Sequence, residues 1–113
     1  METEFELSTV TYAELQERAM TGWAYFDQEH DGWWQEVPVD LLDLQVSDLC
    51  VLGLLYGTFD IGLAKHGLSK GASIPLGLFT RSGTNGKPLP DYEEQYRALT
   101  LIWGEEIITR QSA

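Results

Sequence analysis

The sequence predicts an all-α fold: a small single-domain helical bundle in which two long helices, at about 11–29 and 91–110, pack on short central helices. Each long stretch begins at a capping signal and repeats apolar residues at helical spacing. Between them, the run from Leu49 to Tyr56 is apolar nearly all round, which is typical of a buried helix. A chain of 113 residues, 43% of them hydrophobic, is large enough to bury its own core.

The first long helix follows residues 1–10, which we expect to form an N-terminal tail. Thr11 and Glu14 fit a capping box, in which each side chain satisfies a free backbone amide of the first turn. Gly22 weakens the helix by about 1 kcal/mol relative to Ala and permits close approach of another element. Asp31-Gly32 is a turn signal that ends the helix. The expected apolar face consists of Tyr12, Leu15, Ala19, Trp23 and Phe26.

The middle of the chain predicts several short helices. Trp33 and Trp34 are adjacent, so we expect one to pack inward and the other to cover the edge of the core. Pro75 argues against a long helix after Ser69. The expected caps are Asp40 for a turn over 41–44, Ser47 or Asp48 for a helix that ends at Tyr56, and Asp60 for the next helix, with Gly57 and Gly67 as left-handed stops.

An exposed loop at about 79–90, rich in Gly, Pro, Ser and Asn, precedes the second long helix. Asp91 is the expected cap of that helix, and the acidic residues of its first turn suit the helix dipole. Its apolar stripe is expected to consist of Tyr92, Tyr96, Leu99, Trp103 and Ile107, widened by Ile102 and Ile108. Residues 11–113 thus form one helical domain.

The charge of the chain is strongly negative and unevenly distributed. The formal net charge is −11, and residues 1–64 contain 13 acidic residues and one basic residue, Arg18. Such a field disfavours direct binding to nucleic acid or to an anionic membrane, and it favours a protein partner with a basic surface. The alternative is that the acidic surface serves only solubility.

The sequence also bears on the cellular compartment. The single cysteine, Cys50, cannot form an internal disulfide, and a reducing cytosol is the simplest setting for it. The amino terminus is acidic, unlike that of a secretory signal. No apolar run approaches the roughly 18 to 20 residues that span a bilayer, so we expect no membrane association.

Two arrangements of reactive side chains are conceivable from the sequence, and we expect neither to act. The cluster of Asp27, Glu29, His30 and Asp31 has spacing that permits a metal site, but a solvated helix end is the simpler interpretation. Cys50 lies among apolar residues, which argues against a nucleophile paired with His30 or His66. His66 precedes Gly67 at a predicted helix end, where a cation is favourable, so we expect it to act as a capping residue. We therefore expect a protein without enzymatic activity, cofactor or metal.

One ordered set of segments resembles a known group of proteins. The segments are Gly32-Trp33-Trp34, residues 39–44 (VDLLDL), residues 50–57 (CVLGLLYG), residues 67–69 (GLS) and residues 99–103 (LTLIW). Their order resembles small uncharacterised accessory proteins of actinobacterial phages and prophages, over about residues 11–110. The sequence departs from that pattern at 70–90. The resemblance implies a phage-encoded accessory protein that acts in the host cytoplasm, and it implies no catalytic residue.

Together these observations predict a non-enzymatic protein that binds a host protein through its acidic amino-terminal half, in the sharpest version as a nucleic-acid mimic that inhibits host defence or transcription. The alternatives are a small-molecule-binding module with an aromatic pocket, a virion or oligomer component, and a small metal-dependent enzyme at residues 27–31. The predicted binding surface consists of Asp27, Glu29, Asp31, Trp33, Trp34, Glu36, Asp40 and Asp43.

Overall fold

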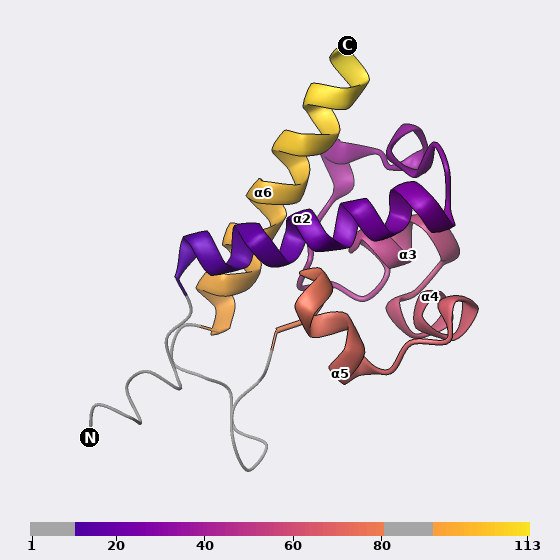
Figure 1. The fold of residues 1–113 in the computed structure, drawn as a ribbon, viewed down its shortest axis with the longest axis vertical. Helices are drawn as coiled ribbons and strands as arrows, with labels where there is room; N and C mark the ends of the chain where they lie inside the picture. The colour runs from indigo at the N-terminus through magenta and orange to yellow at the C-terminus, as the bar shows by residue number, and fades with distance from the viewer. Residues whose placement is uncertain (1–10, 81–91) are drawn as a thin grey trace.

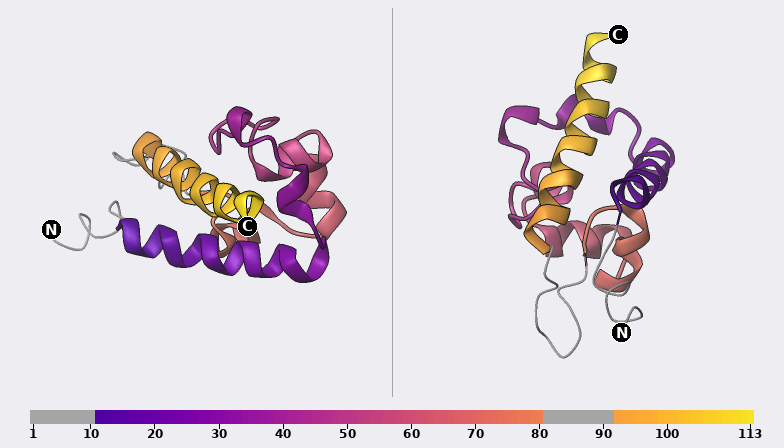
Figure 2. Two further views of the ribbon diagram at one scale, coloured as in Figure 1. Left: turned by 90° about the horizontal axis from the view of Figure 1, so that it is seen from above. Right: turned by 90° about the vertical axis from the view of Figure 1, so that its left-hand side faces the viewer.

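A computed structural model of the chain describes residues 11–80 and 92–113. All regular structure in these two ranges is helical, and the short elements fold around two long helices, which confirms the predicted all-α bundle (Figures 1 and 2). The elements are α2 (Tyr12–Glu29), η1 (Trp33–Glu36), η2 (Val39–Leu41), α3 (Val51–Tyr56), α4 (Phe59–His66), α5 (Lys70–Ser73), η3 (Ile74–Leu76) and α6 (Tyr92–Ser112), where η denotes a 3-10 helix.

The two long helices have nearly the predicted bounds and cross each other (Figure 1). The capping box at the start of α2 is formed: the Glu14 amide donates to Thr11 Oγ1 over 3.1 Å, and the Thr11 amide donates to Glu14 Oε1 over 3.0 Å. Helix α6 continues two residues beyond the predicted end. Most of the predicted stripes are buried, but Tyr12 and Ile108 are exposed.

The core is centred on three aromatic side chains, Phe26, Trp33 and Trp103, each fully buried. Their ring centroids lie 5.6 Å (Phe26–Trp33), 5.6 Å (Trp33–Trp103) and 6.2 Å (Phe26–Trp103) apart. Both buried indoles have acceptors: Trp103 Nε1 donates to the Gly77 carbonyl over 2.9 Å, and Trp33 Nε1 donates to Asp27 Oδ1 over 3.0 Å. Large rings with satisfied N–H groups combine apolar burial with little polar cost.

Close backbone contact joins α2 to the segment after α5, as predicted from Gly22. A Cβ at Gly22 would lie 2.0 Å from the carbonyl oxygen of Leu76. Gly77, which follows η3, contacts α2 in the same way. It has a left-handed φ of 71°, and a Cβ there would lie 2.7 Å from Ala19 Cα. The two glycines therefore set the distance between α2 and η3.

The predicted caps of η2, α3 and α4 are wrong, whereas Ser69 begins α5 as its cap, and its Oγ accepts from the Ala72 amide over 3.1 Å. Helix η2 spans Val39–Leu41 without a side-chain cap, so Asp40 lies inside it. Helix α3 begins after Cys50, whose Sγ accepts from the Gly53 amide over 3.3 Å. The predicted caps Ser47 and Asp48 both precede the helix start, and Ser47 instead accepts from the Phe59 amide, through its carbonyl oxygen over 2.9 Å and its Oγ over 3.3 Å.

Helix α4 has Thr58 as its cap in place of the predicted Asp60. Thr58 is extended, and its Oγ1 accepts from the Ile61 amide over 3.1 Å, whereas Asp60 lies in the first turn. The predicted stops at Gly57 and Gly67 are confirmed, with φ of 114° and 65°. Gly57 lies between α3 and α4, which pack against each other, and Gly67 ends α4.

Residues 79 and 80, the first two of the exposed loop expected at about 79–90, have no regular secondary structure but are not exposed. Phe79 is half-buried and stacks on Phe59 with ring centroids 5.7 Å apart, and Thr80 is buried and donates to Gln95 Oε1. The remainder of that loop, the N-terminal tail, the Asp91 cap and the Tyr92 side chain lie outside the described residues.

Candidate functional site

Asp27, the first residue of the predicted acidic surface, takes part in an intramolecular ion pair. Arg110 of α6 donates to both of its carboxylate oxygens, over 2.6 and 3.1 Å, and also donates to Glu106 over 2.7 Å. The Arg110 guanidinium holds the pKa of Asp27 below its ordinary value, and it lies 5.5 Å from the ring centroid of Trp33. The Asp27 carboxylate therefore fastens α6 to α2, which leaves less of its charge for a partner.

The other predicted acids differ in their availability. Glu29, Asp31 and Asp40 are exposed. Glu36 is exposed but accepts from His30 Nε2 over 3.1 Å. Asp43 is half-buried, and its Oδ1 accepts from the Gln45 amide over 3.1 Å. The exposed acids among them, all in residues 27–40, form the acidic edge: Glu29, Asp31, Glu36 and Asp40.

The predicted places of the two adjacent tryptophans are confirmed in one respect and wrong in another. Trp33 packs inward and Trp34 is half-buried at the edge, as expected. Full burial of Trp33, however, excludes it from any binding surface, because it fills the space between Phe26 and Trp103. Of the two tryptophans, only Trp34 can therefore contribute to a binding surface.

A continuous hydrogen-bonded chain, which the sequence analysis did not predict, links both histidines of the protein. It runs from Tyr25 of α2 to His66 of α4 (2.9 Å), from His66 to Tyr56 of α3 (2.7 Å), from Tyr56 to His30 (2.6 Å), and from His30 to Glu36 of η1 (3.1 Å). We call these five residues the histidine–tyrosine chain. The spacing of these residues along the sequence does not predict the chain, because each member comes from a different turn or element.

The histidine–tyrosine chain can be completed with both imidazoles neutral. Tyr25 then donates to His66 Nδ1, and His66 Nε2–H donates to Tyr56. Tyr56 donates to His30 Nδ1, and His30 Nε2–H donates to the Glu36 carboxylate. A proton added to His30 Nδ1 exchanges the donor and acceptor roles in the three bonds between Tyr25 and His30. All four hydrogen bonds of the chain are then still made. A second added proton makes both imidazoles donors at both nitrogens, so the Tyr56 hydroxyl proton has no acceptor within the chain.

The expectation that His66 serves as a cation at a helix end is wrong. Burial lowers the pKa of His66 below its ordinary value, and the neighbouring His30 lowers it further. Burial also raises the pKa of Tyr56, with a further contribution from the charge of Glu36. The neutral imidazole of His66 thus joins two neutral hydroxyls instead of acting on the helix dipole.

The two reactive arrangements weighed from the sequence do not form in the described residues. All four ring nitrogens of His30 and His66 contact Tyr or Glu side chains, so neither is paired with Cys50. Burial raises the pKa of Cys50, which keeps the thiol protonated. Among residues 11–80 and 92–113, no group of three or more His, Cys, Asp or Glu side chains is arranged to hold a metal ion.

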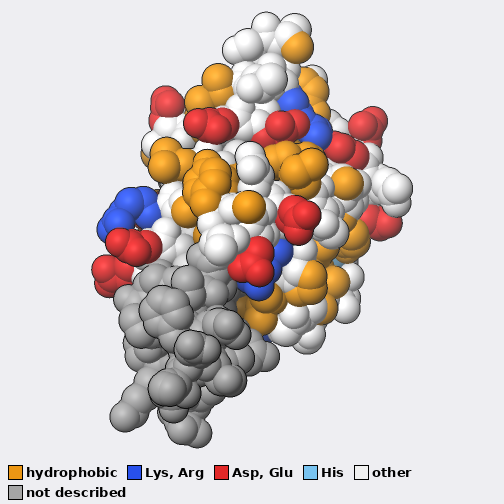
Figure 3. Space-filling view, turned by 60° about the vertical axis from the view of Figure 1, so that its left-hand side comes forward, with side chains coloured by type: hydrophobic (Ala, Val, Ile, Leu, Met, Phe, Trp, Pro, Cys, Tyr) orange, Lys and Arg blue, Asp and Glu red, His pale blue; other side chains and the backbone are white. Residues whose placement is uncertain are grey.

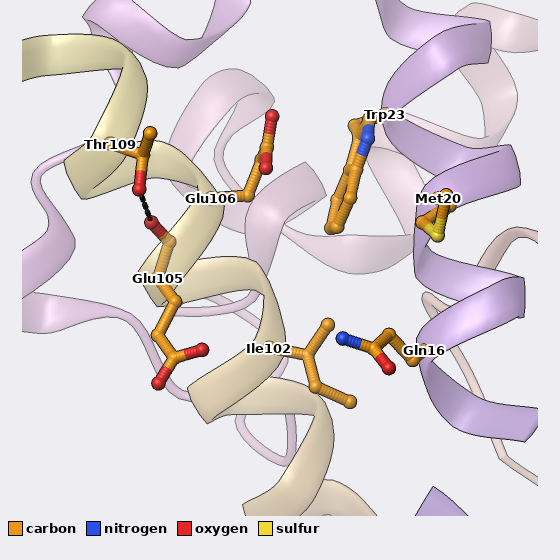
Figure 4. A pocket seen from close by; sticks show the side chains of 7 residues that line it. All are labelled: Gln16, Met20, Trp23, Ile102, Glu105, Glu106 and Thr109. Carbon is orange, nitrogen blue, oxygen red and sulfur yellow. Dashed lines mark hydrogen bonds between the residues drawn. The ribbon is translucent and has the colours of Figure 1, made fainter. Parts of the chain in front are cut away.

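A groove lies between the two long helices (Figure 4). It has a volume of about 340 Å³. In Figure 4, three side chains of α2 face Ile102 and Glu106 of α6 across the gap, while the Glu105 carboxylate is turned away from α2. We call it the α2/α6 groove, and it is lined by Gln16, Met20, Trp23, Ile102, Glu105, Glu106 and Thr109.

A second groove, of about 460 Å³, lies on another side of α6. Its lining includes the predicted binding residue Asp43 together with Glu93 and Arg97, so its charges are mixed. Neither described groove is lined by Trp33, Trp34 or Trp103. The geometry therefore gives the aromatic-pocket alternative no support at these three rings.

The visible surface is anionic with apolar side chains between the charges. Figure 3 views the molecule from the side on which α6 lies in front, and it shows acidic side chains scattered among exposed apolar ones. In the described ranges, no helix combines the length and the apolar character required to cross a membrane. Comparison with protein-family models, with characterised proteins and with solved structures finds no match to this chain.

Proposed function

We propose that the protein binds a host protein with a basic surface without catalysing a reaction, as a phage-encoded accessory protein in the host cytoplasm. The observation that supports this proposal is the sign of the surface. The described ranges contain fourteen Asp and Glu residues, none of them buried, and five Lys and Arg residues. One of these bases, Arg110, is held by Asp27 and Glu106. Such a surface attracts cationic partners and repels nucleic acid.

The acidic edge is the part of this surface that best suits a partner. Glu29, Asp31 and Asp40 are exposed. Trp34 lies half-buried in the same segment, and tryptophan is enriched at the energetic centres of interfaces. A basic site that normally binds nucleic acid, in a host nuclease or in the transcription machinery, has the matching charge.

The proposal is tested by retention of host-lysate proteins on the immobilised protein at about 0.05 M and about 0.5 M NaCl. We expect basic proteins to be retained at low salt and released at high salt, because exposed charges are screened within about 10 Å at 0.1 M salt. Retention of the same proteins at both salt concentrations would contradict a charge-driven interaction.

Two sets of variants distinguish the contribution of the carboxylates to retention from that of the overall net charge. Replacing Glu29, Asp31 and Asp40 together (E29Q/D31N/D40N) removes three negative charges from the acidic edge. The matched control Q28K/Q35K/Q45K changes the net charge equally, at exposed glutamines close by, but keeps every carboxylate. We expect the first set to weaken retention more than the second. Equal weakening would show that only the overall field acts and that the acidic edge is not the contact surface.

A further inference from the structure

The exposed apolar side chains are concentrated on the two long helices. Of the seven large apolar side chains that are exposed in the described ranges, four belong to α2 and α6: Tyr12, Met20, Leu101 and Ile108. Tyr12, Gln16, Met20 and Trp23 follow one another at spacings of four, four and three residues and thus share one side of α2. On α6, Ile102 is the apolar side chain that lines the groove, whereas Leu101 lines the second groove. Exposed apolar surface therefore borders the α2/α6 groove on the α2 side, at Met20.

The floor of the groove is fixed by the core beneath it. Trp23 meets the buried Trp103 edge-on, with ring centroids 5.7 Å apart and planes at 88°. Ile102 is buried at the other wall, 3% exposed. Met20, at 52% exposure, is the adaptable part of the lining, since its thioether side chain adjusts to many apolar shapes. A rigid aromatic floor with one adaptable side chain suits an inserted apolar group.

The charges around the groove define the occupant. Glu105 and Glu106 line it; Glu105 is exposed, whereas the Glu106 carboxylate is paired with Arg110. Glu17, exposed on α2, precedes Met20 by three residues and adds a carboxylate on the opposite helix. A cationic segment complements this rim. A second copy of the chain, with a net charge of −11, would bring like charges together.

We propose that the α2/α6 groove anchors a basic amphipathic helical segment of the partner protein, with one bulky aliphatic side chain of that segment inserted between Met20, Trp23 and Ile102. This inference rests on the proposed function and names the part of the partner that would give it specificity. Amphipathic helices bind commonly in this way, with apolar anchors in a groove and charges at its rim. Glu106 lines the groove and is joined through Arg110 to Asp27, which precedes Glu29 of the acidic edge by two residues, so one basic partner can contact both.

The test uses a labelled synthetic peptide of about 18 residues, with Leu on one helical face and Lys on the other, and measures its binding to the full chain by fluorescence anisotropy. We expect Met20→Ser to weaken binding by about fivefold or more, because the inserted side chain loses its apolar neighbour. The matched control Ile61→Ser removes an equally exposed apolar side chain, 47% exposed, from α4, away from the groove. Equal weakening by the two variants would overturn the proposal.

Two changes to the peptide test the two parts of the recognition. A peptide with Ser in place of Leu is expected to lose most of its affinity for the wild-type protein and to show no further loss with Met20→Ser. If this peptide binds as tightly as the original, the groove does not anchor an apolar group. A peptide with Glu in place of Lys is expected not to bind, and equal binding by it would contradict the charge complementarity.

The remaining outcomes separate this inference from the proposed function. Binding that is lost in E29Q/D31N/D40N and unaffected by Met20→Ser would overturn the groove as an anchor while the acidic edge stands. Absence of any binding by the Lys-rich peptide at about 0.05 M NaCl would overturn the groove inference, while retention of basic lysate proteins at the same salt concentration would leave the proposed function standing. A concentration-dependent dimer abolished by Met20→Ser would show that a second copy occupies the groove, which also overturns the inference.

Discussion

The thiol of Cys50 performs the task that a hydroxyl or carboxylate usually performs at a helix start. Its Sγ accepts from the Gly53 amide and contacts the Ser47 carbonyl oxygen over 3.4 Å. The side chain is 2% exposed, and burial raises the pKa of the thiol. Cys50 is thus both a cap and a core residue, which gives a physical reason for a cysteine at this position without any reactivity.

Replacement of Cys50 tests this double role. We expect Cys50→Ala to lower the free energy of unfolding by about 1–2 kcal/mol, the typical cost of a lost cap, to which a small cavity term is added. Cys50→Ser keeps an acceptor for the Gly53 amide, so we expect it to lose less. Urea unfolding curves of the three proteins measure the difference. A Cys50→Ala variant as stable as the wild type would show that the thiol does not cap α3.

Gly22 offers a prediction whose sign separates local propensity from tertiary contact. Helix propensity alone predicts that Gly22→Ala stabilises α2 by about 1 kcal/mol. The contact with the Leu76 carbonyl predicts destabilisation instead, by about 1–3 kcal/mol, because the backbone must shift to admit a Cβ. Thermal unfolding of the variant decides between the two.

Gly104 is the matched control for Gly22. It lies in α6, and a Cβ there would meet Val39 Cγ2 at 3.7 Å, an ordinary van der Waals distance. Gly104→Ala is therefore expected to follow helix propensity and to stabilise the protein by up to about 1 kcal/mol. Stabilisation by both substitutions would show that α2 and η3 are not held at the distance described.

At the scale of elements, the histidine–tyrosine chain joins α2, η1, α3 and α4 through side chains alone. Tyr56 occupies its centre, because its hydroxyl contacts one nitrogen of each imidazole. We expect Tyr56→Phe to lower the free energy of unfolding near pH 7.5 by about 1–2 kcal/mol, since both nitrogens lose a partner in a partly buried site. Urea unfolding measures this loss, and an unchanged stability would show that water replaces the hydroxyl at no cost.

The lowered pKa of His66 predicts a specific dependence of stability on pH. As pH falls below about 6.5, the unfolded chain binds a proton at this residue before the folded chain does. Stability contributed by neutral His66 is therefore complete above that pH and decreases toward the lower pKa of the folded state. Unfolding curves collected at several pH values, with an NMR titration of the ring protons, test this prediction.

The control for the pH prediction is His66→Gln. This variant is expected to be less stable than the wild type near pH 7.5, because Tyr25 and Tyr56 lose their shared partner. It is also expected to lose less stability on acidification from about pH 6.5 to about pH 5.5, since the residue that titrates has been removed. An identical loss in both proteins would show that the titration of His66 does not cause the effect.

For the whole molecule, net charge sets the response to salt. Like charges repel one another in the compact state, and the formal net charge at pH 7 is −11. We expect the Tm to rise by about 2–6 °C between about 0.05 M and about 0.5 M NaCl, because the added ions screen this repulsion. The rise should become smaller as the pH approaches the isoelectric point of about 4.3. A Tm that falls with salt would show that attractive pairs such as Asp27–Arg110 outweigh the repulsion.

The sequence by itself determined the long helices and the sign of the surface. Thr11 and Glu14 interact within one helical turn, and the stripe from Leu99 to Ile107 repeats at the helical period, so contiguous residues contain the whole signal. The glycine stops at Gly57 and Gly67 depend only on local backbone conformation, and the charge is a count. None of these features requires knowledge of which elements lie side by side.

Only the tertiary structure decided which of the predicted side chains remain free to bind a partner or to cap a helix. Asp27 is paired with Arg110, 83 residues away, and Trp33 turns inward to meet Trp103. Ser47 accepts from the amide of Phe59, twelve residues away, and Cys50 caps α3. The physical reason is that each of these partners comes from a different element, and their meeting depends on how the helices pack, which no local pattern of the sequence specifies.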